Sequence, residues 1–150
     1  MMKTVSKKAF TAVIACMLAC VMFVTPVFAA TNYFSKTTVK LNAYNGGSST
    51  KSTVSSGSVS GTDRSITSVS LYCNVSSGTD PYTLYVLSPS GKQYSVSGPT
   101  SSTTLTTTAF NGEDPNGTWT IWIVNSGYTT HGNIYPVSTV TVTLKVYYSY

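Results

Sequence analysis

Apolar and polar residues alternate along four stretches of this 150-residue chain. Alternation with a period of two is the pattern of a β-strand that buries one face and exposes the other. The four stretches are residues 66–75, 82–87, 118–124 and 139–148. Weaker versions of the same pattern predict further strands over residues 37–43, 53–60 and 103–110.

No stretch beyond residue 30 keeps the 3.6-residue period of an amphipathic helix. Short strands separated by Gly-rich turns are typical of an all-β fold, and we predict an antiparallel β-sandwich of jelly-roll type. The turns agree with this prediction. Residues 88–91, Ser-Pro-Ser-Gly, favour a tight hairpin, and residues 114–117, Asp-Pro-Asn-Gly, have the residue order of a type I turn. Residues 30–36 are expected to form a loose N-terminus.

The phase of each alternation predicts which side chains are buried. Trp119 shares its phase with Ile121 and Ile123, which places it in the core. Cys73 has the phase of Leu71 on its own strand, so we expect a buried, unreactive thiol.

The first 29 residues differ in character from the rest. Three lysines, at positions 3, 7 and 8, precede an apolar run over residues 9–24, and Ala29 follows in a sequence that a signal peptidase accepts. This order predicts a secretory signal peptide over residues 1–29 and a secreted protein. A cut after Ala30 is the alternative.

Two other interpretations of the leader are weaker. A membrane anchor needs roughly 20 apolar residues, which is more than the uninterrupted run provides. Lipidation of Cys20 would require this cysteine to begin the mature chain, whereas apolar residues continue beyond it. We therefore expect no stable membrane insertion after signal cleavage.

Removal of the leader changes the charge and the cysteine count. The basic residues fall from nine to six against four acids, so the net charge falls from +5 to +2. This near-neutral balance argues against nucleic-acid binding, which requires clustered Lys and Arg. Cys73 is then the only cysteine, so the fold depends on its hydrophobic core rather than on internal disulfides.

Two sequence blocks resemble a known family. Residues 84–91, Leu-Tyr-Val-Leu-Ser-Pro-Ser-Gly, and 112–121, Gly-Glu-Asp-Pro-Asn-Gly-Thr-Trp-Thr-Ile, resemble the P domain (P/Homo B domain). That domain follows the catalytic domain in kexin- and furin-like proprotein convertases and in some bacterial subtilisin-like proteases. The resemblance covers roughly residues 60–147. Its motif residues here are Ser88, Pro89, Gly91, Gly112, Glu113, Gly117 and Trp119.

The resemblance implies a jelly-roll β-sandwich with a non-catalytic role that stabilises a protease. It divides the chain into the signal peptide (1–29), an N-terminal segment with the first strands (30–60), and a free-standing P-domain-like sandwich (61–150). We expect the last two segments to form one domain.

Catalysis and metal binding have little support in the sequence. His131 is the only histidine and has no nucleophile elbow to serve, so we expect no enzyme activity and no catalytic residues. We expect no cofactor, with calcium as the one alternative. Asp80, Glu113 and Asp114 would supply oxygen ligands for calcium if their loops converge; otherwise they are turn residues.

Aromatic residues provide the best binding hypothesis. Trp122, Tyr72, Tyr85 and Tyr147 have the phase opposite to the predicted core. If that face is exposed, their rings and the neighbouring hydroxyls suit sugar rings or a protein partner. The alternative is that loops cover them.

Three functions follow in order of preference. The first is a secreted, non-catalytic module that mediates extracellular interaction or stabilisation, with a protein partner such as a protease. The second is a carbohydrate- or cell-wall-binding module. The third is a structural matrix subunit in which residues 139–148 act as an edge strand that pairs between chains.

Overall fold

The computed structural model describes residues 29–127, 132 and 135–150, so the predicted signal peptide lies almost wholly outside the described residues. The described chain is all-β, as the sequence predicted. Its strands are β1 (Thr31–Thr37), β2 (Leu41–Tyr44), β3 (Ser52–Ser55), β4 (Ser65–Val75), β5 (Tyr82–Leu87), β6 (Gln93–Ser97), β7 (Thr103–Thr107), β8 (Thr118–Asn125) and β9 (Val137–Ser149).

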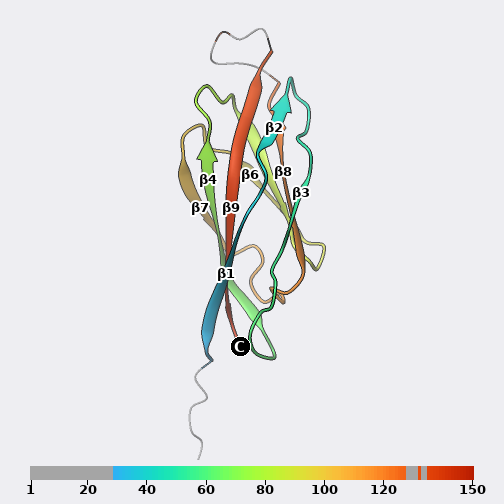
Figure 1. Cartoon of the computed structure of the whole chain (residues 1–150), viewed down its shortest axis with the longest axis vertical. Coiled ribbons are helices and arrows are strands. Elements are labelled where there is room, and N and C mark those ends of the chain that lie inside the picture. The colour runs from blue at the N-terminus through green and yellow to red at the C-terminus, as the bar shows by residue number, and fades with distance from the viewer. Residues whose placement is uncertain (1–28, 128–131, 133–134) are drawn as a thin grey trace, which may run out of the picture.

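The strands form two antiparallel sheets (Figure 1). The β9 sheet has the order β1-β9-β4-β7, and β2 pairs with β9 beyond the end of β1; the β8 sheet has the order β3-β8-β5-β6. The first strand in the sequence pairs with the last, and later pairs join strands that are progressively closer in sequence. The pairs are β1 with β9, β3 with β8, β4 with β7 and β5 with β6. Successive pairs alternate between the sheets, which is the topology of a jelly roll and confirms the predicted fold.

The four strongly alternating stretches are β4, β5, β8 and β9. Every second side chain of β9 between Ser138 and Tyr148 is buried, because this strand lies in the middle of its sheet with one face on the core. That position corrects the idea that residues 139–148 form a free edge. β9 pairs with β1 and β2 on one side and with β4 on the other, so its backbone is already hydrogen-bonded on both sides.

The N-terminal segment differs from the prediction. Residues 31–37 are not a loose terminus but a seven-residue strand paired with β9 along its whole length. The predicted strand over residues 37–43 is instead split between β1 and β2. Only Phe34 is buried in β1, so the segment lacks the apolar alternation that would reveal a strand. Its ordering comes from pairing with a strand more than 100 residues away.

The hairpin over residues 88–91 joins β5 to β6, a strand that the alternation did not predict. The Ser88 and Lys92 backbones close the turn, and Gly91 has φ +90°, which favours glycine. β6 has no buried residue because it is an edge strand, and this weakens its pattern.

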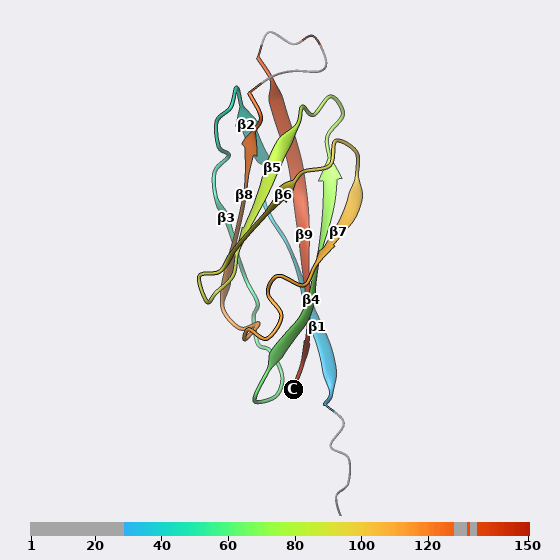
Figure 2. The same cartoon turned by 180° about the vertical axis from the view of Figure 1, so that it is seen from behind.

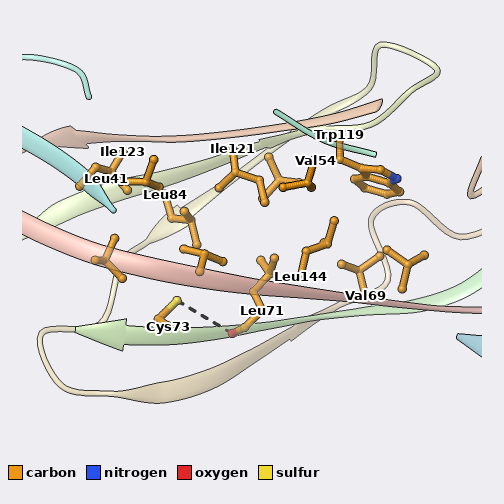
Figure 3. Close-up of a cluster of buried hydrophobic side chains, with 14 of the residues drawn as sticks. Leu41, Val54, Val69, Leu71, Cys73, Leu84, Trp119, Ile121, Ile123 and Leu144 are labelled. Carbon is orange, nitrogen blue, oxygen red and sulfur yellow. Dashed lines mark hydrogen bonds between the residues drawn. The ribbon is translucent and has the colours of Figure 1, made fainter. Parts of the chain in front are cut away.

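The core fills the space between the two sheets (Figure 3). Trp119 is fully buried, as predicted, and packs edge-on against Phe110 with ring centroids 5.1 Å apart. Figure 3 shows Ile121 and Leu84 on one side of the core, opposite Leu71 on the other.

Cys73 is a free, fully buried thiol, which confirms the predicted burial. Its Sγ lies 3.9 Å from the Leu71 carbonyl oxygen (Figure 3). Burial raises the pKa of Cys73 to about 11, so the group stays a protonated thiol at neutral pH.

Candidate functional site

The four aromatic residues singled out in the sequence do not form one surface. Tyr72 and Tyr147 lie on the outer face of the β9 sheet, whereas Tyr85 and Trp122 lie on the outer face of the β8 sheet. The two faces point away from each other across the sandwich. The single aromatic surface predicted from phase is therefore wrong, because alternation gives the side of a strand and not the sheet that contains it.

The Tyr85 and Trp122 rings are covered by each other and by neighbouring groups, rather than open to a ligand. The rings face each other across β5 and β8 and stack with centroids 5.1 Å apart and planes at 6°. The Lys51 ammonium lies 4.7 Å from the Trp122 ring centroid. Only 8% of Trp122 is exposed, so its ring offers little surface to a ligand.

Tyr147 belongs to an open groove on the other face. The groove has a volume of about 500 Å³ and lies where β1, β9 and β4 meet. Tyr33 is the direct cross-strand neighbour of Tyr147, and the two ring centroids are 5.8 Å apart. We call this feature the tyrosine groove; its lining residues are Thr31, Asn32, Tyr33, Thr67, Ser68, Tyr147 and Tyr148.

A β-bulge supplies hydroxyls to the tyrosine groove. Ile66 pairs with Tyr148 and Ser68 pairs with Tyr147, so Thr67 is an extra residue in β4. The bulge lets Ile66 enter the core although its alternation phase would place it outside. Thr67 and Ser68 then both line the groove beside Tyr147.

Lys145 adds a positive charge next to the rings. Its ammonium lies 3.9 Å from the Tyr33 ring centroid and 4.9 Å from that of Tyr147, within cation–π range of both. A hydrogen bond with Tyr147 raises the pKa of Lys145 above its ordinary value, so the amine is charged at neutral pH. The strands of the β9 sheet contain no Asp or Glu, since all four acids of the chain lie in loops.

Tyr72 extends the same face. It is 45% exposed and pairs with Thr143, four residues along β9 from Tyr147, a step of roughly 13 Å. Ser70 and Lys145 pair with each other in the row between the two tyrosines, so a hydroxyl group and an ammonium group separate the aromatic rings on this face.

The two blocks that resemble the P domain meet in space. Ser90 Oγ donates a hydrogen bond of 2.6 Å to Glu113, whose carboxylate also lies 3.6 Å from the Lys92 ammonium. Gly117 lies against Pro89, and Trp119 Nε1 donates to the Pro115 carbonyl at 3.2 Å. These contacts form a structural corner at one end of the sandwich.

The other motif residues stabilise the same corner. Ser88 Oγ lies 2.8 Å from Ser90 Oγ, and the Gly112 backbone N–H donates to the Ile66 carbonyl. Arg64 holds the Asp114 carboxylate at 3.1 Å and lowers the pKa of Asp114 through that hydrogen bond. Glu113 and Asp114 therefore already have basic partners within the fold.

The three acids considered for calcium do not converge. Asp80 follows the end of β4 and accepts a hydrogen bond from the Val137 N–H, whereas Glu113 and Asp114 lie near the start of β4. β4 has 11 residues, which separates the two ends by roughly 34 Å. A calcium site built from all three residues is thus incompatible with the fold. Among the described residues, no three His, Cys, Asp or Glu side chains cluster as metal ligands.

Of the residues that line the tyrosine groove, sequence reasoning singled out Tyr147 alone; it missed Tyr33 and also Lys145 beside the groove. Tyr33 was assigned to a loose terminus, and Lys145 was not singled out. No local signal marks Tyr33, because β1 buries only Phe34 and its place beside Tyr147 follows from the pairing with β9. His131 lies outside the described residues. Within the described ranges, no helix has the length and apolarity needed to cross a membrane.

Comparisons with known proteins give a likeness of fold. No family model matches the chain, and no curated protein matches it. A crystal structure of FlhE is similar in fold, with a TM-score of 0.53 and 21% sequence identity. The match covers 81% of this chain and 98% of FlhE. At this identity the likeness concerns the fold alone, and the P-domain resemblance stays a prediction.

Proposed function

We propose that this protein is an exported, non-catalytic β-sandwich module that binds saccharides in the tyrosine groove. The observation that carries the proposal is the pair of exposed Tyr33 and half-buried Tyr147, beside Lys145 and the hydroxyls of the bulge. Tyr33 is 53% exposed, so its ring is available to a ligand.

The chemistry of the tyrosine groove suits a sugar. Tyrosine rings offer an apolar surface with a polar tip, and the C–H faces of a pyranose pack on such rings. Thr67 and Ser68 supply donors and acceptors for sugar hydroxyls, as in binding sites that combine apolar walls with a few polar groups.

Lys145 indicates a preference among sugars. Its ammonium has no acidic residue on the same sheet to neutralise it. A carboxylate on the ligand would add a charge-assisted contact that a neutral sugar lacks. Uronic-acid-containing or otherwise carboxylated saccharides are therefore the favoured class.

A binding titration with two oligosaccharides tests the proposal. The probes are a chitin oligosaccharide, which is neutral, and an oligogalacturonide, which carries a carboxylate on each ring. We expect both to bind, the acidic one more tightly. Tyr147→Ala and Tyr33→Ala should each weaken binding of both probes about tenfold, the equivalent of about 1.4 kcal/mol for a lost stacking surface.

Two further variants separate the contributions. Lys145→Met should weaken only the oligogalacturonide. Tyr44→Ala removes a tyrosine of similar exposure from β2, outside the groove, and should bind as the wild type does. If the wild type binds neither probe, or if the Tyr33→Ala/Tyr147→Ala double variant binds unchanged, the proposal is wrong.

A second candidate is an accessory role beside a protease, as the P-domain resemblance implies. The observation in its favour is that both resembling blocks join in one corner through Ser90, Glu113 and Pro89. The test adds the purified protein to a subtilisin-like protease that has no such domain and follows its activity at elevated temperature. A longer half-life of the protease supports the role, and an unchanged half-life contradicts it.

A further inference from the structure

β7 differs from the other edge strands of the sandwich. β1 contains Lys36, and β2, β3 and β6 directly follow Lys40, Lys51 and Lys92. Lysine on or beside an edge strand discourages pairing with another chain. β7 is flanked by Ser102 and Thr108, and no charged residue occurs anywhere between residues 93 and 112.

The sequence of β7 is also symmetric. It reads Thr-Thr-Leu-Thr-Thr, with Leu105 at the centre. Antiparallel pairing of two copies about Leu105 would form an isologous two-fold contact, and the symmetric sequence would place like residues opposite each other. The pairing matches Thr103 with Thr107, Thr104 with Thr106, and Leu105 with Leu105 of the second copy.

Leu105 is an apolar residue that the monomer covers only in part. It pairs with Leu71 of β4 and packs against the edge of the core, yet it stays half-buried because no strand follows on its other side. Val96 and Tyr94 of β6, the edge of the other sheet, are also only partly buried. β1 and β3 contact each other at one side of the sandwich, so β6 and β7 are the edges of the two sheets at the other side. Figure 2 shows the chain passing from β6 over to β7 at the right of the view.

We propose that two copies of this protein associate through antiparallel pairing of their β7 strands. Each β7 presents unpaired backbone N–H and C=O groups along its free edge, and the partner strand satisfies them. The two β9 sheets then form one continuous sheet, with the two Leu105 side chains adjacent at its centre. A five-residue edge buries less surface than a standard interface, so the dimer is concentration-dependent.

This geometry has a consequence for the tyrosine groove. The two-fold axis between paired antiparallel strands runs perpendicular to the sheet, so both outer faces of the β9 sheet point the same way. The dimer therefore presents two tyrosine grooves on one surface, which favours repetitive ligands through avidity. The dimer itself does not depend on what the groove binds.

The test measures molar mass in solution, by sedimentation equilibrium of the full protein over a wide concentration range. The wild type should form a dimer as the concentration rises. In Thr104→Lys/Thr106→Lys, each introduced lysine faces another lysine of the partner, so this variant should stay monomeric. In Thr104→Lys/Thr106→Glu, the same pairing sets each lysine opposite a glutamate, and the dimer should return.

A matched control introduces two lysines on the other sheet. Thr53→Lys/Ser55→Lys changes two exposed positions of β3 and should leave the dimer intact. A wild type that stays monomeric up to ~1 mM overturns the proposal, since an affinity weaker than this has no practical effect. A dimer that survives the double-lysine change, or one that the lysine–glutamate variant does not restore, overturns it equally.

Discussion

Trp119→Ala is expected to lower the free energy of unfolding by about 3–5 kcal/mol, a large part of the stability of a domain of this size. The Trp119 side chain is fully buried between the sheets and packs edge-on against Phe110. Its removal also leaves the Pro115 carbonyl without the hydrogen bond from Nε1. Both sheets surround the site, so the cavity cannot collapse completely. Urea denaturation with an unchanged m-value would measure the loss.

Trp122→Ala is the matched control in the same strand. Trp122 is on the outer face, where its ring stacks on Tyr85 and lies 4.7 Å from the Lys51 ammonium. Trp122 lies outside the core cluster, and water can enter the space that its removal opens on the outer face, so the loss of unfolding free energy should be smaller than for Trp119→Ala. Equal losses for the two variants would contradict the assignment of Trp119 alone to the core.

Gly117→Ala should have the second largest effect and lower the free energy of unfolding by roughly 3 kcal/mol. Gly117 has φ +128°, a conformation that residues with a side chain rarely adopt. A Cβ at this position would lie 2.8 Å from Pro89 Cβ, closer than real contacts allow. The change would force apart the two P-domain-like blocks. Thermal unfolding of the wild type and the variant gives the measurement.

Gly91→Ala separates the two causes. Gly91 also has a positive φ, at +90°, but a Cβ built there meets no atom within 4 Å. Gly91→Ala should therefore lower the free energy of unfolding only through backbone strain, by about 1 kcal/mol. If Gly91→Ala destabilises the protein as much as Gly117→Ala does, the close contact with Pro89 has no energetic role.

The sequence predicted a strand correctly where one face of that strand is buried in the core. β4, β5, β8 and β9 alternate clearly because each has one face on the core. β1 buries only Phe34 and β6 buries no residue fully, so neither shows the pattern. Edge strands are held in place mainly by hydrogen bonds to a neighbouring strand. That neighbour is distant in the sequence, so the local pattern of apolar residues does not reveal it.

The candidate site was less predictable than the fold. Tyr147 was identified, but its partners Tyr33 and Lys145 were not. Tyr33 reaches Tyr147 only because β1 pairs with β9 in a particular register. The bulge at Thr67 is likewise invisible in the alternation, which it interrupts by one residue. Both features depend on contacts between segments that are far apart in the chain.

The amino-acid sequence by itself determined the all-β class, the jelly-roll prediction, the burial of Trp119 and Cys73, and the hairpin after Ser88. These properties follow from local periodicity and turn chemistry, which each segment carries on its own. The tertiary structure alone decided on which sheet each aromatic residue lies and which aromatic residues are neighbours. It also decided that Asp80 lies far from Glu113, and that β9 is a central strand while β7 is an edge strand. The physical reason is that strand pairing and register are long-range choices, made by the whole core and not by any one segment.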